Sequence, residues 1–302
     1  MSEMSEYHVP VMLDECIAGL KINPSGKYVD VTFGAGGHSQ SILNNIDDNG
    51  HLYGFDQDDD AMANQIDDPR FTFIKANFRY IQKFLRVEGV KQVDGILADL
   101  GVSSWQFDYP ERGFSYRFDA DLDMRMNNAD ELTAALILKE YSQDDLQMLF
   151  SKFGEVRNAR TLAREIVQRR DKAPIRTTFQ LNEILEPLRF GHKAKYYAQV
   201  YQSLRMEVNQ EIQVLQEMLE GGLEVLKPGG RFVVMSYHSI EDRCVKNFFK
   251  SGDVDGVLNK DDFGHIDRPF KLITKKVVLA TDEEVSLNSR AKSAKLRIAE
   301  KL

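Results

Sequence analysis

The fold class follows from one stretch of sequence, YVDVTFGAGGHS at residues 28–39. Its first half is β-branched, aromatic and apolar, as in a buried strand, and glycines follow at once. Glycines between a strand and a helix let a ligand approach the backbone closely, and the start of the helix favours a negatively charged group. This stretch predicts a ligand-binding turn, although an ordinary structural turn is also compatible with it.

Strand and helix patterns alternate outward from this stretch, which predicts a parallel sheet covered on both faces. Further strands are expected at residues 52–55, 71–74 and 93–98. The pattern then becomes helical at residues 132–141, 143–153 and 158–170. A long helix is expected over residues 198–226, and strands resume at residues 231–236, 270–279 and 294–298. We therefore predict an α/β domain formed by residues 1–103 and 198–302, interrupted by a helical insertion at residues 104–197.

Composition narrows the class of protein. The 302 residues carry a net charge of −8, which argues against a protein that coats nucleic acid nonspecifically but allows a local basic patch. Cys16 and Cys244 form no metal-ligand spacing, so no metal site is expected and a reduced cytoplasm fits. No signal peptide and no apolar run of about 18 residues is seen, so we expect no membrane association.

Two carboxylates follow predicted strands, and they point to a nucleoside-containing cofactor. Asp56 ends the second strand, 20 residues after Gly36, where it can accept hydrogen bonds from ribose hydroxyls. Asp99 ends the fourth strand, although a turn or cap residue is also compatible there. The spacing GAGGHS puts Ser39 where a dinucleotide-binding loop has its last glycine. This favours S-adenosylmethionine over NAD, and an NAD-dependent oxidoreductase is the alternative.

Several long motifs occur together and in order, and they carry a resemblance to a known family. They are HVPVML at His8, DGILADLGVSSWQ at Asp94, RGFS at Arg112, LDMRM at Leu122, FGEVRNARTLAREIV at Phe153, SYHSIEDRCVK at Ser236 and KSAKLR at Lys292. The sequence resembles the bacterial ribosomal RNA cytosine-N4 methyltransferases (the MraW family) along nearly its whole length. The resemblance implies a Rossmann-like class I S-adenosylmethionine-dependent methyltransferase sheet with an inserted helical domain.

The same resemblance implies the substrate and the cofactor contacts. The implied substrate is the N4 amine of a cytosine in 16S ribosomal RNA near the decoding centre, in the assembled small subunit, with no DNA partner. The implied cofactor contacts are Gly36, Gly37, His38, Asp56, Phe78, Asp99 and Gln106. Phe78 would pack on the adenine ring. The chain departs from the family pattern at Lys195–Arg205 and at Trp105, which affects the assignment of RNA contacts rather than the cofactor loop.

The catalytic candidates are Asp99 and His238. An acceptor on the N4 hydrogens would assist methylation, and Asp99 or a carbonyl of the following turn can supply it. The chain lacks the [DNS]PP[YF] motif of many amino-methyltransferases, so the detailed role of Asp99 is open. His238, in SYHSIEDR, is equally compatible with a capped helix start. Methylation at cytosine C5 would need a nucleophilic cysteine, and neither cysteine follows a strand.

RNA contacts are expected in the insertion. Arg157, Arg160 and Arg164 have the spacing i, i+3 and i+7, which places them on one helical face. A solvated face with ion pairs is the alternative. A second basic cluster, at the tail, is compatible with RNA binding or with a strand edge protected by charge; it comprises Arg290, Lys292, Lys295 and Arg297. The sequence is also compatible with a small-molecule methyltransferase and with a nonenzymatic RNA-binding module.

Overall fold

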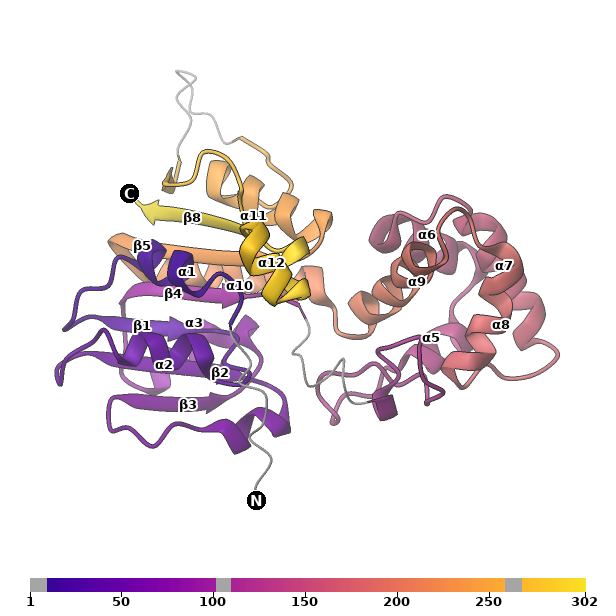
Figure 1. Cartoon of the computed structure of the whole chain (residues 1–302), viewed down its shortest axis with the longest axis horizontal. Helices are drawn as coiled ribbons and strands as arrows, with labels where there is room; N and C mark the ends of the chain where they lie inside the picture. Colours follow the sequence, from indigo (N-terminus) through magenta and orange to yellow (C-terminus); the bar gives the residue numbers. More distant parts are fainter. Residues whose placement is uncertain (1–9, 102–109, 259–267) are drawn as a thin grey trace. The chain divides into compact units, whose positions relative to one another are not determined.

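The computed structural model describes residues 10–101, 110–258 and 268–302, and it divides the chain into two compact units (Figure 1). One comprises Met1–Gly101 and Gln213–Leu302 and is called the sheet unit here. The other comprises Val102–Ile212 and is called the helical unit. In the described part of the chain, no helix is both long and apolar enough to cross a membrane.

A mixed sheet with strand order β3-β2-β1-β4-β5-β8-β6 forms the sheet unit. The strands are β1 Lys27–Asp30, β2 His51–Asp56, β3 Phe71–Lys75, β4 Val93–Asp99, β5 Leu226–Ser236, β6 Phe270–Leu272, β7 Val278–Leu279 and β8 Lys295–Lys301. Neighbours among β1 to β5 pair in parallel, whereas β8 is antiparallel to β5, β6 and β7. The chain runs from β1 outward to β3 and returns to β4 on the other side of β1. Ligands of doubly wound sheets bind at such a reversal, beyond the carboxyl ends of the strands.

Helices cover both faces of this sheet. They are α1 Leu13–Leu20, α2 Gly37–Leu43, α3 Ile81–Val87, α10 Glu211–Val225, α11 Ser239–Ser251 and α12 Asp282–Leu287. Phe232 and Val234 face one apolar core and Val233 and Met235 the other, because side chains alternate along a strand. Burial on both faces explains why the sequence of β5 is a continuous apolar run rather than an alternating one. The predicted fold class is confirmed.

Short helices around a single apolar core form the helical unit. They are α5 Ala134–Glu140, α6 Gln143–Gly154, α7 Ala159–Arg170, α8 Thr178–Leu188 and α9 Lys193–Val208. The core includes Leu146, Phe150, Leu162 and Leu185. Thr133, Ser142 and Thr177 each precede a helix and accept a hydrogen bond from a backbone N–H of its first turn. Such caps satisfy donors that have no partner within the helix.

The second boundary of the insertion differs from the expected one. The helical unit ends at Ile212, whereas the sequence predicted an end at residue 197. The reason is α9, which buries one face in the core of the helical unit; its buried residues there are Tyr196, Tyr197, Val200, Tyr201, Leu204 and Val208. The apolar and aromatic spacing of α9 shows that it has a buried face, but not which core it meets.

The single helix expected over residues 198–226 is wrong, because the chain forms two helices there. They are separated at Asn209 and Gln210, and Gln210 has a left-handed φ of 49°. The Asn209 side chain accepts from the N–H of Met126 at 2.7 Å and donates to the carbonyl of Met124 at 2.8 Å. These contacts fix the end of α9 to a segment more than 80 residues away. The strand expected over residues 270–279 is likewise two short strands, β6 and β7.

Candidate active site at the carboxyl edge of the sheet

The parallel strands β1 to β5 bring five segments to one edge of the sheet unit. The glycine loop follows β1, Asp56 ends β2, Phe78 follows β3, Asp99 ends β4 and Tyr237 follows β5. The edge therefore assembles most of the residues that the sequence singled out. Gln106, another predicted cofactor contact, lies outside the described residues.

Two glycines of the loop are required for different physical reasons. Gly36 has a φ of 77°, which strains any residue with a side chain, and it stands directly before α2. A Cβ on Gly37 would lie 2.3 Å from Cγ of Pro10, so this glycine admits a neighbouring part of the chain. Gly36 thus fits the predicted turn. At Gly37, the space that a side chain would need is already filled by Pro10 rather than left open for a ligand.

The Asp56 carboxylate holds the glycine loop in place. One oxygen accepts from the N–H of Gly34 and the other from the N–H of Asp58, each at 2.9 Å. Burial raises the pKa of Asp56 to about 6, against the lowering effect of these two hydrogen bonds. The residue is half-buried, and a carboxylate oxygen has more than one lone pair. Asp56 can therefore accept further hydrogen bonds from the hydroxyls of a ligand.

Asp99 lies in a network with residues from the segment after β1, from α2 and from the segment after β5. The Tyr237 hydroxyl donates to Oδ1 of Asp99 at 2.8 Å, and the Asp99 N–H donates to Oγ1 of Thr32 at 2.7 Å. Oδ2 of Asp99 lies 4.0 Å from Nδ1 of His38, and a quarter of the Asp99 side chain is exposed. Burial raises the pKa of Asp99 to about 6, while His38 and Tyr237 oppose this rise.

A second aspartate, Asp30 at the end of β1, is joined to this network through Thr32. It is 1% exposed, and its carboxylate accepts from the Ser39 hydroxyl at 2.7 Å and from the Thr32 N–H at 3.1 Å. Burial raises the pKa of Asp30, and the hydrogen bonds from Ser39 and Thr32 oppose this rise. Sequence reasoning did not single out Asp30 or Tyr237. An acid inside the otherwise apolar YVDVTF was the available signal for Asp30.

Both ring nitrogens of His38 lie near polar atoms of the protein. Nε2 lies 3.1 Å from the carbonyl oxygen of Val11, which can only accept, so Nε2 carries a proton. Nδ1 faces Asp99, and the residue is 7% exposed. At 4.0 Å the imidazole and the carboxylate are too far apart for a hydrogen bond, so His38 acts on Asp99 only through its charge or dipole. A direct cofactor contact by His38 stays a prediction.

Phe78 follows β3, at the same edge of the sheet as Asp56 and Asp99. It is half-buried in the turn η2 (Phe78–Tyr80) and packs against the sheet core. The Asn77 side chain before it accepts from the N–H of Arg79 at 3.0 Å and donates to Oε1 of Gln57, just after β2, at 2.8 Å. The segments after β2 and β3 are therefore joined, which places Phe78 on the same side of the sheet as Asp56.

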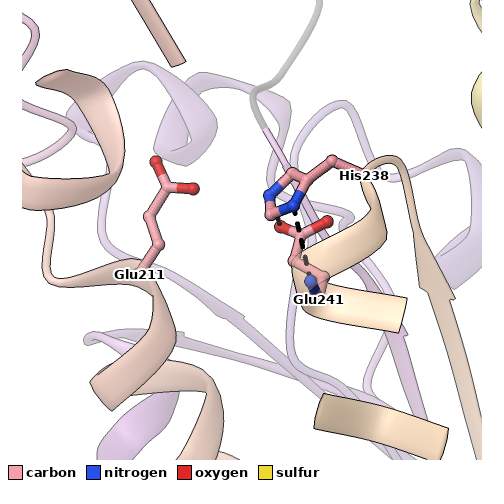
Figure 2. Close-up of side chains that lie close together, drawn as sticks. All are labelled: Glu211, His238 and Glu241. Atoms are coloured by element: carbon pink, nitrogen blue, oxygen red, sulfur yellow. Dashed lines mark hydrogen bonds and ion pairs between the residues drawn. The ribbon is translucent and has the colours of Figure 1, made fainter. Parts of the chain in front are cut away.

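His238 is the residue before α11, and its observed role is that of a helix cap. Nδ1 accepts from the N–H of Glu241 at 3.4 Å, and Nε2 lies 3.0 Å from Oε1 of Glu241 (Figure 2). Oε2 of the same carboxylate accepts from the Tyr237 N–H at 3.1 Å, and Glu241 is 4% exposed. The third residue labelled in that view, Glu211, belongs to the helical unit. A catalytic role for His238 stays a prediction.

Comparison with known proteins identifies the family. The MraW methylase family matches residues 5–302. The chain belongs to the MraW methylase family. A protein of Flavobacterium johnsoniae named ribosomal RNA small subunit methyltransferase H is 55% identical over the full length of both chains. Proteins of the same name from Bacteroides thetaiotaomicron, 53% identical over 98% of this chain and 97% of the relative, and Christiangramia forsetii, 52% identical over both full lengths, are also similar.

Family membership confirms the resemblance found in the sequence. This MraW methylase is an enzyme, a methyltransferase whose methyl donor is S-adenosylmethionine. The choice of the methyl donor over NAD is therefore confirmed. The NAD-dependent oxidoreductase and the nonenzymatic module are set aside.

The arginines that the sequence assigned to RNA lie in the helical unit of this methylase, and all three are exposed. Arg157 precedes Asn158, the residue before α7, so it is not on the helix as expected. Its guanidinium lies over the ring of Phe190, 5.6 Å from the ring centre. Arg164 pairs with Glu165 at 3.2 Å. Within the described residues, Arg160 makes no ion pair.

The basic tail is less available than its composition indicated. Arg297 in β8 pairs with both carboxylate oxygens of Asp242 in α11, at 2.7 and 3.1 Å, and its side chain is 12% exposed. A largely buried bidentate pair of this kind is structural, because separating it would leave a poorly solvated charge without a partner. Arg297 thus joins β8 to α11, whereas Lys292 of the same cluster is exposed, and RNA binding by the cluster stays a prediction.

Proposed function

We propose that this methylase transfers a methyl group from S-adenosylmethionine to the N4 amine of a cytosine in small-subunit ribosomal RNA. The observation that carries the proposal is the pair of partly exposed carboxylates, Asp56 and Asp99, at the ends of β2 and β4 on either side of the glycine loop. The names of the full-length relatives support the choice of RNA.

The residues at the edge of the sheet fit the methyl donor. Asp56 would accept from the ribose hydroxyls, Phe78 would pack on the adenine, and the turn at Gly36 and Gly37 would lie beside the amino-acid part. When bound, S-adenosylmethionine supplies a methyl group on a positively charged sulfur. With pKa values raised to about 6, Asp56 and Asp99 are still mostly ionised at neutral pH, and their negative charge suits a cationic donor.

Asp99 would act on the target amine. The lone pair of cytosine N4 is delocalised into the ring, and a hydrogen bond from N4–H to a carboxylate favours its return to the nitrogen. Tyr237 holds Oδ1 of Asp99, which leaves Oδ2 to accept from the amine. A pKa of about 6 keeps the carboxylate ionised at neutral pH yet makes it a better acceptor than an ordinary aspartate.

The two cysteines favour N4 over C5 as the methylated atom. Methylation at C5 uses a cysteine thiolate as a nucleophile, and such residues have lowered pKa values. Cys16 is buried in α1, and burial raises the pKa of its thiol. Cys244 is half-buried in α11, and burial raises its pKa as well. Neither thiol suits nucleophilic attack.

The finer parts of the proposal come from the family resemblance. The substrate would be the assembled small subunit in the cytoplasm, with the methylated cytosine near the decoding centre, and Arg157, Arg160 and Arg164 would contact RNA phosphates. Membrane and DNA play no part in this proposal.

Methyl transfer to three substrates in parallel tests the proposal. Labelled S-adenosylmethionine would be offered with naked 16S RNA, isolated small subunits and whole ribosomes, and the RNA would then be digested to nucleosides. We expect N4-methylcytidine, formed fastest on small subunits. Label at C5, or no transfer to any of the three, would overturn the assignment.

A further inference from the structure

The connection between α8 and α9 exposes an aromatic ring. Phe190 lies two residues after α8 and is 59% exposed. Single exposed apolar residues are common and need no explanation. This one differs in its surroundings, because the segment that carries it, RFGHKAK at residues 189–195, holds three further cationic side chains.

The cations near Phe190 come from two parts of the helical unit. Arg157 lies over the ring, and the Asn158 side chain donates to the carbonyl of Leu188 at 2.9 Å, so the start of α7 is fixed to the end of α8. Arg189 and Lys193 share the carboxylate of Glu186, at 3.3 and 2.6 Å. Two cations against one carboxylate leave a net positive charge there.

Two more exposed cations follow in the neighbouring helices. Lys195 is exposed in the first turn of α9, and Arg160 is exposed in the first turn of α7. The acid in contact with these cations is Glu186, which already pairs with Arg189 and Lys193. Lys195 lies two positions after Lys193, on another face of α9, so the set that we call the Phe190 surface leaves it out; it comprises Arg157, Arg160, Arg189, Phe190 and Lys193. An exposed aromatic ring among exposed cations has the chemistry of a site for single-stranded nucleic acid.

We propose that Phe190 stacks on an unpaired base of the RNA substrate while Arg157 and Arg160 contact the neighbouring phosphates. The inference rests on the proposed RNA substrate and adds the form in which that RNA is recognised. A duplex hides its bases and would use the cations alone, whereas an unpaired base can use the ring as well. An apolar protein partner would also cover Phe190, but the surrounding positive charge favours a polyanion.

Binding of the full-length protein to a labelled oligouridine and to an RNA duplex of equal length tests this inference. Phe190→Ala is expected to weaken oligouridine binding about 5- to 150-fold and duplex binding much less. Phe190→Tyr should bind as the parent does. The salt dependence should stay unchanged in both variants, because stacking releases no counterions, whereas Arg157→Gln should lower the log–log slope by about 0.7.

Phe179 provides the matched control, because it is a 48% exposed phenylalanine on α8 of the same unit. Its neighbour is an acid rather than a cation, since its N–H lies 3.3 Å from the carboxylate of Asp119. Phe179→Ala should leave oligouridine binding unchanged. Equal losses in the two alanine variants, or no loss in Phe190→Ala, would overturn the inference. A loss of binding to intact small subunits alone, with oligouridine binding unchanged, would assign the surface to a ribosomal protein and also overturn it.

Failure of the stacking site and failure of the proposed methylation would give different results. If the parent protein forms no N4-methylcytidine but binds oligouridine through Phe190, the proposed methylation fails and the stacking site stands. If the parent methylates small subunits and Phe190→Ala does so with the same KM and the same oligouridine affinity, only the stacking site fails.

Discussion

The charged residues of the two units differ in sign and in burial. At the edge of the sheet unit, Asp56 and Asp99 are half-buried, have fixed partners and have pKa values raised to about 6. In the helical unit, Arg157 and Arg160 are exposed. Salt screens exposed charges strongly and partly buried charges much less. A net charge of −8 therefore describes neither region, and the two sites should respond differently to salt and to substitution.

The largest effect is expected at Asp99. Asp99→Ala removes the acceptor for the target amine, and turnover should fall about 100- to 1,000-fold or more, as for other preorganised groups at a reacting centre. RNA binding should be unchanged. The measurement is single-turnover methyl transfer to small subunits.

Asp94 offers the control for Asp99, because it lies near the start of the same strand. It pairs with Lys227 at 2.9 Å, far along β4 from the carboxyl edge. Asp94→Ala should keep the chemical step close to the parent rate. If Asp99→Ala also turns over at the parent rate, Asp99 has no catalytic role.

The next largest effect is expected on cofactor binding. Asp56→Ala removes the ribose acceptor and should weaken binding of S-adenosylhomocysteine by roughly 1–3 kcal/mol, or about 5- to 150-fold. Asp56→Asn, which keeps one acceptor oxygen, should lose less. Titration calorimetry measures both, with the exposed Asp59→Ala as the control. Unchanged affinity in Asp56→Ala would remove Asp56 from the cofactor site.

A smaller effect is expected from the exposed arginines. Replacing Arg157, Arg160 and Arg164 together by Gln should lower the log–log salt slope of RNA binding by about 2, at about 0.7 per phosphate contact. The matched control replaces three exposed lysines of the same unit by Gln, namely Lys139, Lys152 and Lys172. An unchanged slope in the arginine variant would mean that these residues make only surface ion pairs, each worth at most about 1 kcal/mol.

The smallest effect is a shift in pH dependence. The Tyr237 hydroxyl stabilises ionised Asp99, so Tyr237→Phe should raise the pKa of Asp99 above its value of about 6. Because the ionised form is the acceptor, the rate should fall as pH drops through this pKa. The acid limb of the pH–rate profile should then move up by about one unit in the variant. An unmoved limb would show that Asp99 ionisation does not control the rate.

The raised pKa values also fix the sign of a stability effect. Asp56 and Asp99 bind protons more tightly in the folded state than at the ordinary value of 3.8. Their stabilising contribution is fully present below about pH 4 and is lost as pH rises through about 6. Asp56→Asn should remove part of this dependence, which urea unfolding between these two pH values would detect.

Local patterns in the sequence were sufficient for the parallel strands β1 to β5 and the glycine loop, but not for the antiparallel β8, which makes the sheet mixed rather than parallel, nor for the two short strands β6 and β7. Strand spacing, the turn at Gly36 and an acid at each strand end are all properties of neighbouring residues, so they can be recognised without the fold. The same is true of the helices α5, α6 and α7, whose expected bounds differ from the observed ones by one or two residues.

What the sequence could not supply depends on distant partners. Tyr237 reaches Asp99 across 138 residues, and Arg297 reaches Asp242 across 55. The end of α9 depends on a contact between Asn209 and Met126 across 83 residues. No local pattern encodes such contacts. For the same reason, Arg297 was grouped with a basic tail, although the fold commits it to an ion pair.

The central claim is that the carboxyl edge of the sheet unit binds the methyl donor and the helical unit binds RNA through separate groups. The most direct test measures both affinities, for S-adenosylhomocysteine and for RNA, in Asp56→Ala and in the triple arginine variant between roughly 50 and 200 mM salt. We predict that Asp56→Ala loses only cofactor affinity, at every salt concentration, and that the arginine variant loses only RNA affinity, most strongly at low salt. Equal loss of both affinities in either variant would contradict the separation.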